Sequence, residues 1–185
     1  GVTSLDVSNF STEKVGTMES MFQYCRSLKS LDVSKFDTGS CTDFSGMFDE
    51  VSVSELKVGD FDTSKATNMK SMFSGMKSVR ALDVSKFNTR NVNDMSFMFQ
   101  GCSRVTELDV SNFDTSNVVD FSNMFHSVRS VPYINVSKFD TRNAEDMSHM
   151  FTYCSTLVTI QLKNFDTSKV KNMNGLFQEC YSLQS

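Results

Sequence analysis

Five cysteines are the first residues in this sequence that could carry chemistry, as disulfides, zinc ligands or nucleophiles. Four share one position of a 25- or 26-residue period with two valines and a methionine: Cys25, Cys102, Cys154 and Cys180, beside Val51, Met76 and Val128. Cysteines that alternate with apolar residues behave as small core side chains, and no Cys-x-x-Cys pair indicates a structural zinc site. Only Cys154 and Cys180 fall in adjacent copies, and their side chains should point the same way, which disfavours a bond. We expect buried free thiols and no metal ligands among them.

Histidine, serine and aspartate could together form a hydrolytic site, which needs convergent partners. The two histidines, His126 and His149, stand at different positions of the period, whereas the serines and aspartates recur in every copy. Catalysis at one point does not require such recurrence. The sequence therefore predicts no catalytic residues, no cofactor and no enzyme activity.

Oxygen-bearing side chains recur at two positions of the period, and each such set of residues is called a file here. Either file could bind calcium. The first file is acidic, apart from one asparagine: Asp37, Asp62, Asn88, Asp114, Asp140 and Asp166. The second is all threonine: Thr12, Thr38, Thr63, Thr89, Thr115, Thr141 and Thr167. Calcium takes six to eight oxygen ligands, but no glycine-aspartate nonapeptide of the β-roll type is present. The favoured alternative is that each carboxylate and hydroxyl bonds its own turn.

The same period runs through the whole chain and predicts a repeat protein. Leu5-Asp6-Val7-Ser8 returns three times in the same letters, as at Leu82-Asp83-Val84-Ser85, and in weaker form elsewhere. Phenylalanine marks a second position in every copy: Phe10, Phe36, Phe61, Phe87, Phe113, Phe139 and Phe165. Most of the 17 Phe and 12 Met fall in such positions, so we interpret them as a stacked core.

Each copy is expected to form one thin coil of a solenoid. The apolar residues of Leu5-Asp6-Val7 alternate with period two, which predicts a short strand with Asp6 facing outward. Ser20 to Cys25, with Met21 and Phe22 adjacent, suits a single helical or 3₁₀ turn. These elements predict an α/β repeat solenoid of about seven coils over residues 1–185, as one array.

The repeated pattern resembles a known family. Met98 to Thr115, which reads Met-Phe-x-x-Cys and continues, with Val105 in place of a leucine, to Leu-Asp-Val-Ser-x-Phe-Asp-Thr, resembles the BspA-type leucine-rich repeat bacterial surface proteins. The resemblance implies a right-handed, leucine-rich-repeat-like coil stack with a parallel β-sheet on one face. It also implies export to the cell surface and adhesion to host or neighbouring-cell molecules.

Composition excludes two other classes of function. Eighteen Lys and Arg against 22 Asp and Glu give a net charge of −4, which does not fit a basic nucleic-acid binder. The sequence contains no apolar run of about 18 residues, so it predicts no membrane-spanning helix. The chain reads as an excerpt of a longer surface protein, with the signal and anchor elsewhere, and end-to-end self-association is expected of uncapped coils.

Candidate binding residues lie where the outward positions carry charge or an aromatic ring. The outward face of the expected sheet holds Asp32, Asp83, Glu107, Asp109 and Tyr133. Away from that face, Phe97 interrupts a position otherwise filled by small or polar residues, and we expect it to be exposed beside Tyr24, Tyr153 and Tyr181. It could bind a partner or pack locally.

The function predicted from these features is non-catalytic binding at the cell surface. The expected partner is a host or neighbouring-cell protein or glycan, of the mucin or extracellular-matrix type. Two alternatives remain: a structural spacer with no ligand of its own, or a calcium-stabilised array.

Overall fold

The computed structural model describes residues 1–184 and has almost no regular secondary structure in them. Its strands are β1 (Ser4–Leu5) and β2 (Ser30–Leu31), which pair in parallel with Ser4 opposite Ser30 and Leu5 opposite Leu31. The described residues contain no helix, so none has the length and apolar character that a membrane crossing requires. The expected α/β solenoid with a parallel sheet and helical turns is therefore wrong, and the fold is mostly irregular.

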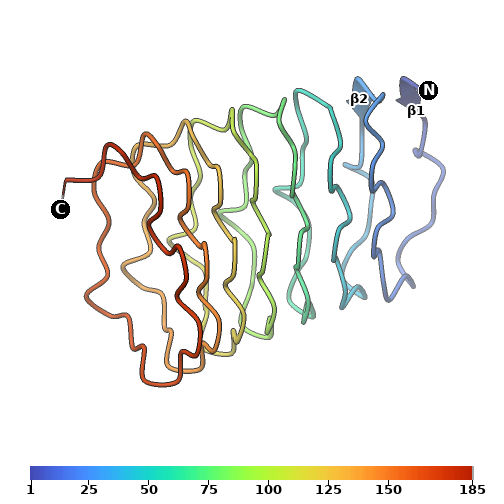
Figure 1. Ribbon diagram of the computed structural model, residues 1–185. Helices are drawn as coiled ribbons and strands as arrows, with labels where there is room; N and C mark the ends of the chain where they lie inside the picture. Colours follow the sequence, from blue (N-terminus) through green and yellow to red (C-terminus); the bar gives the residue numbers. More distant parts are fainter. Residues whose placement is uncertain (185) are drawn as a thin grey trace.

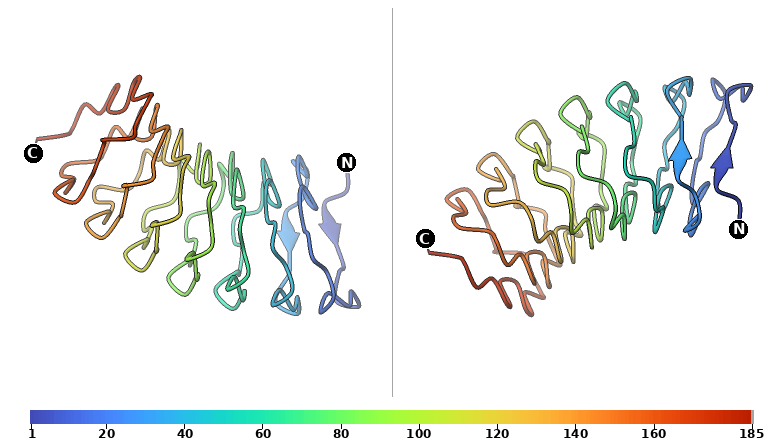
Figure 2. Two further views of the ribbon diagram at one scale, coloured as in Figure 1. Left: turned by 90° about the horizontal axis from the view of Figure 1, so that it is seen from below. Right: turned by 90° about the horizontal axis from the view of Figure 1, so that it is seen from above.

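The irregular chain is nevertheless laid out as successive coils that lie side by side from one end to the other (Figures 1 and 2). Neighbouring coils are joined by isolated parallel bridges between residues one period apart. The most continuous series links Thr17, Asp43, Asn68, Asp94, Asp120, Asp146 and Asn172. This series lies outside the expected sheet face, where only Ala81–Glu107 and Tyr133–Thr159 add bridges to the β1–β2 pair.

Helical turns fail to form because alternate backbone N–H groups of the expected turn bond to the next coil. Within residues 18–25, the N–H groups of Met18, Ser20 and Phe22 donate to carbonyls one coil on, at 2.8–3.0 Å. The intervening N–H groups of Met21 and Gln23 close turns onto carbonyls three residues back. A helix would direct every amide along its own axis, so alternate donation across coils replaces it.

Strands stop early because a side chain takes over the backbone's hydrogen bond. In the Leu-Asp-Val-Ser segment, the Ser8 N–H donates to the Asp6 carboxylate at 2.9 Å, and the Phe10 N–H then donates to the Val7 carbonyl. Aspartate competes in this way with regular pairing and starts a turn. The strand predicted from the period-two pattern therefore ends after Leu5.

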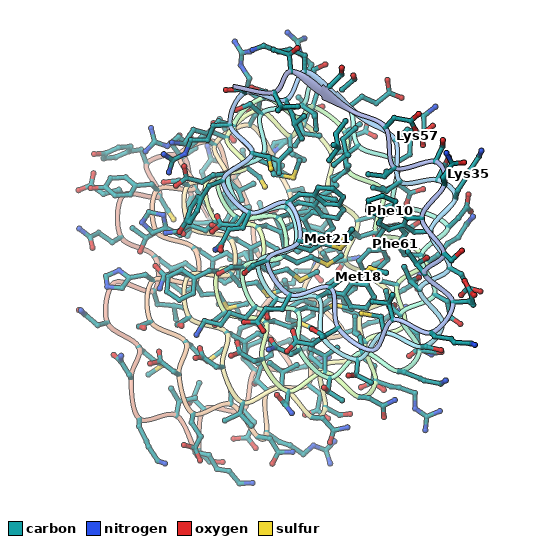
Figure 3. All side chains as sticks on the ribbon, turned by 90° about the vertical axis from the view of Figure 1, so that its right-hand side faces the viewer. Phe10, Met18, Met21, Lys35, Lys57 and Phe61 are labelled. Atoms are coloured by element: carbon teal, nitrogen blue, oxygen red, sulfur yellow. The ribbon has the colours of Figure 1, made fainter. Side chains whose placement is uncertain are left out.

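The core runs along the axis of the stack, as the repeated apolar positions predict. Seen along the axis, Phe10, Met18 and Phe61 lie inside the coils, whereas Lys35 and Lys57 lie outside (Figure 3). One file of rings stacks from coil to coil with centroids 5.5–5.8 Å apart: Phe22, Phe48, Phe73, Phe99, Phe125, Phe151 and Phe177. That spacing gives offset stacking, and the expectation of a stacked Phe and Met core is confirmed.

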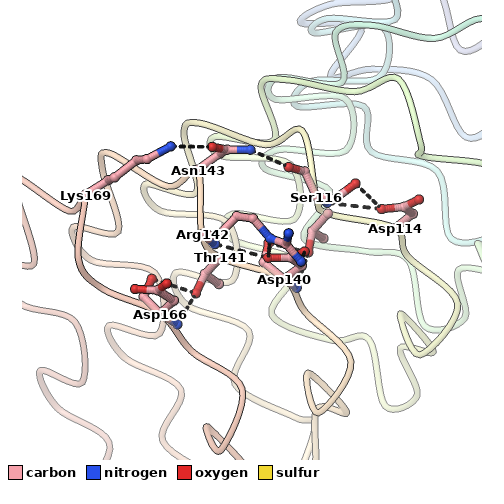
Figure 4. Close-up of polar contacts among 9 residues, drawn as sticks. Asp114, Ser116, Asp140, Thr141, Arg142, Asn143, Asp166 and Lys169 are labelled. Atoms are coloured by element: carbon pink, nitrogen blue, oxygen red, sulfur yellow. Dashed lines mark hydrogen bonds and ion pairs between the residues drawn. The ribbon is translucent and has the colours of Figure 1, made fainter.

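The threonine file couples the coils rather than closing its own turns. The Thr115 hydroxyl donates to the Asp140 carbonyl at 3.0 Å and accepts the Asp140 N–H at 2.8 Å, both in the next coil. Thr141 repeats this arrangement with Asp166 (Figure 4). Both threonines are only 1% exposed. The expectation that the threonine hydroxyls bond within their own turn is wrong, because the neighbouring backbone offers both a donor and an acceptor.

Replacing Thr115 with valine should destabilise the protein by about 1–3 kcal/mol, since it leaves a buried N–H and carbonyl of Asp140 without their partner. Thr115→Ser keeps the hydroxyl and serves as the control. The measurement is the free energy of unfolding in urea. Equal stability of the valine and serine variants would contradict a coupling role for the hydroxyl.

Candidate functional site

Four candidate residues lie exposed on the expected strand face and are called the acidic face here: Asp83, Glu107, Asp109 and Tyr133. Parallel bridges place two of them, because Glu107 pairs with Ala81 and Tyr133 with Thr159. The Tyr133 side chain is 45% exposed. A ring so exposed is available to a partner.

The two aspartates of the acidic face are held in place by hydrogen bonds from their own turns. Asp83 accepts from the Ser85 hydroxyl at 2.7 Å and from the Ser85 N–H at 3.1 Å, and these bonds lower the pKa of Asp83. The pKa of Asp109 is lowered mainly by hydrogen bonds from Ser111, although the charge of Asp83 opposes this shift. The two carboxylates occupy the same position of adjacent copies. Together they present a preorganised negative patch.

Asp32 lies apart from that patch, in a shallow open depression of about 470 Å³ near the first coils. Its neighbours there include Lys29, Glu55 and Lys57, and an ion pair joins Lys57 to Glu55 at 3.6 Å. Charges of both signs meet in this depression, so it does not extend the acidic face. Lys29 could not be predicted from the sequence, because it lies outside the two positions of the period that are expected to face outward.

Phe97 is half-buried rather than exposed as expected. Its backbone has a φ of +60°, a left-handed conformation that favours glycine and asparagine. Every member of its file is left-handed: Ser20, Gly46, Ser71, Phe97, Asn123, His149 and Gly175. The Lys70 ammonium lies 5.9 Å from the ring centroid. Phe97 therefore packs against its local neighbours, at a backbone position that is strained for a residue with a side chain.

The tyrosines expected beside Phe97 do not form one file. Tyr24 and Tyr153 share a second left-handed position, whose last member is Glu179 rather than Tyr181. Tyr24 and Tyr181 are 56% and 78% exposed, but they belong to opposite ends of the stack. No single aromatic patch is formed by these residues.

All five cysteines are free, and they behave as core side chains. Three donate to a carbonyl of the preceding coil at 3.0–3.2 Å: Cys102 to Phe73, Cys154 to Phe125, and Cys180 to Phe151. Burial raises the pKa of Cys102 and of Cys154 to about 12. A thiol held protonated in this way is a poor nucleophile and metal ligand.

The acidic file is engaged in its own turns, as predicted. Asp114 accepts from the Ser116 N–H and hydroxyl, and Asp140 accepts from the Arg142 N–H and guanidinium (Figure 4). Within residues 1–184, no group of three or more His, Cys, Asp or Glu side chains is placed to hold a metal ion. The geometry thus favours turn formation over calcium binding for this file.

Phe97→Asn should change the free energy of unfolding by less than about 1 kcal/mol, because relief of left-handed strain offsets the lost packing. Phe99→Ala, two residues on, removes a fully buried ring and should cost about 3–5 kcal/mol. Urea denaturation of both variants makes the comparison. A similar loss at the two positions would place Phe97 in the core.

Neither EDTA nor added calcium should change the melting temperature of the protein, because the carboxylates of the acidic file already accept hydrogen bonds from their own turns. Differential scanning calorimetry tests this. A rise in melting temperature with calcium that Asp114→Asn and Asp140→Asn abolish would instead support a calcium-stabilised array.

Comparison with known proteins supports the repeated architecture. A family model described as "Mycoplasma protein of unknown function, DUF285" matches the chain over three overlapping ranges, 2–107, 42–151 and 74–185. Since one model fits in three shifted positions, the prediction of a repeat protein is confirmed. No curated protein matches the chain. The matched ranges together span nearly all of the sequence, and the chain therefore belongs to the DUF285 family.

Proposed function

We propose that this protein is a non-catalytic binding module of the cell surface, which recognises a protein or glycan of the host or of neighbouring cells. The observation that carries the proposal is the acidic face: Asp83, Glu107 and Asp109 are exposed on the same face as the exposed ring of Tyr133. Charge and an aromatic ring on a fixed backbone are the usual means of recognising a partner.

The partner that suits this face is a protein with a basic patch. Carboxylates held by their own turns lose little conformational freedom when they pair with Lys or Arg of a partner. Steering by the negative patch would speed association at low ionic strength and weaken as salt screens it. Surface glycoproteins and matrix proteins with basic segments are the expected class.

The surface location rests on the resemblance of the Met-Phe-x-x-Cys and Leu-Asp-Val-Ser motifs to BspA-type leucine-rich repeat surface proteins. That likeness supports export and adhesion for this chain. Self-association through the ends of the stack is a further prediction of the repeat.

A structural spacer is the second candidate, and one observation favours it. Backbone hydrogen bonds pass from coil to coil through the stack, from Met18–Asp43 near one end to Met147–Asn172 near the other. A stack linked in this way would hold another domain at a distance whether or not it binds a ligand. The two candidates differ in whether any partner is captured.

The decisive variant replaces each residue of the acidic face with one that the repeat itself uses at that position. Asp83→Asn and Asp109→Asn imitate Asn135, whose side chain still accepts the turn hydrogen bond. Glu107→Ala imitates Ala81, and Tyr133→Thr imitates Thr159. The combined variant should bind an array of mucins, matrix proteins and glycans at least about tenfold more weakly, with its melting temperature preserved.

The matched control removes three carboxylates from another file, as Asp62→Asn, Asp114→Asn and Asp140→Asn, and so changes the net charge equally. It should bind like the unaltered protein. Equal binding by the acidic-face variant would exclude that face. Absence of any captured partner for the unaltered protein would contradict the binding proposal and favour the spacer.

A further inference from the structure

A groove of about 430 Å³ crosses the third to fifth coils, away from the acidic face, and it is called the glycine groove here. Its lining includes Gly75, Gly101, Lys77, Gln100, His126 and Arg129. The volume lies in the range of small-molecule sites, about 300–1,000 Å³. None of these residues belongs to the candidates predicted from the sequence.

Two successive glycines lie in the groove, but only Gly101 leaves it open, because a Cβ on Gly75 would meet Glu50 Cγ at 2.6 Å. They belong to the second left-handed file, which reads Tyr24, Glu50, Gly75, Gly101, Ser127, Tyr153 and Glu179. Five of the seven members carry a side chain at the same positive φ, so the backbone alone does not require glycine. A Cβ on Gly101 would meet only the Gly75 backbone, at 3.5 Å, which is ordinary contact. The effect of glycine at 101 is therefore to leave the backbone uncovered.

The groove carries an excess of positive charge. Lys77 and Arg129 line it, and neither forms an ion pair with any described residue. The carboxylate among the lining residues, Glu50, is already paired with Arg26. The Arg129 guanidinium lies 5.5 Å from the ring centroid of Tyr153, which holds it in place without neutralising it. Two such cations suit an anionic group.

The rest of the lining consists of residues with hydrogen-bonding side chains and includes no Val, Leu, Ile, Met or Phe. Gln100 accepts from the Ser74 hydroxyl at 3.4 Å, and Ser103 and Ser127 add two further hydroxyls. His126 contributes a shielded Nδ1 that has no hydrogen-bond partner among the described residues.

We propose that the glycine groove binds a carboxylated saccharide. Lys77 and Arg129 would pair with its carboxylate, and Gln100 and the serine hydroxyls would bond its ring hydroxyls, above the uncovered Gly101 backbone. A peptide is less well matched, because peptide recognition relies on buried apolar anchors that this lining does not offer. The proposal does not depend on the acidic face, which comprises different residues.

The test uses the protein with two carboxylated probes, a short hyaluronan oligosaccharide and sialyllactose, and with carboxyl-reduced or unsialylated counterparts. Titration calorimetry should show binding of at least one carboxylated probe, and at least about tenfold weaker binding of its neutral counterpart. Lys77→Gln with Arg129→Gln should weaken binding at least about tenfold. Lys65→Gln with Lys163→Gln removes equal charge elsewhere and should leave it unchanged.

A second variant fills the groove without removing charge. Gly101→Asn adds a side chain at a φ that Asn123 already adopts in the neighbouring file, so the melting temperature should be preserved while saccharide binding is lost. Normal binding by Gly101→Asn, or no binding of either carboxylated probe, would overturn the proposal. Equal binding of an acidic peptide would also overturn it. The acidic-face variant should bind the saccharide normally, which separates this site from the proposed function.

Discussion

Alternate donation of backbone amides from each coil to the next is the interaction on which the rest of this structure depends. In residues 18–25 and the matching residues of later copies, alternate N–H groups donate to carbonyls of the next coil. The N–H groups that lie between them donate within their own coil and close tight turns. This alternation requires a left-handed residue at two positions of each copy, and all fourteen such positions have a positive φ. Glycine, which adopts this conformation without strain, fills four of the fourteen.

Side-chain packing follows from the same constraint. Because coils are locked in register, like residues lie over like, and the Phe22-to-Phe177 rings form one offset stack through the protein. Threonines such as Thr115 and Thr141 add a second coupling on another side, where one hydroxyl satisfies both backbone groups of the next coil. Stability is thus shared between neighbours, as in other repeat proteins.

Function is left to the positions that this architecture does not use. The acidic face and the glycine groove both lie where copies depart from the others: Tyr133 replaces a smaller residue, and Gly75 and Gly101 stand where the other copies carry a side chain. An interior that repeats in every coil cannot distinguish one coil from another. Differences among exposed residues can, and the backbone that carries them is ordered by the neighbouring coils.

The sequence by itself determined the repeat, its period, the apolar core positions and the buried character of the cysteines, since these depend only on which residues recur and how far apart. It could not reveal that Asp6 would end its strand after Leu5, or that Met18 and Ser20 would donate across coils instead of along a helix. The glycine groove was equally hidden, because Lys77 and Arg129 are far apart in the sequence. Local pattern predicts which side chains face inward, but the partner of each backbone amide is chosen only when the next coil is in place.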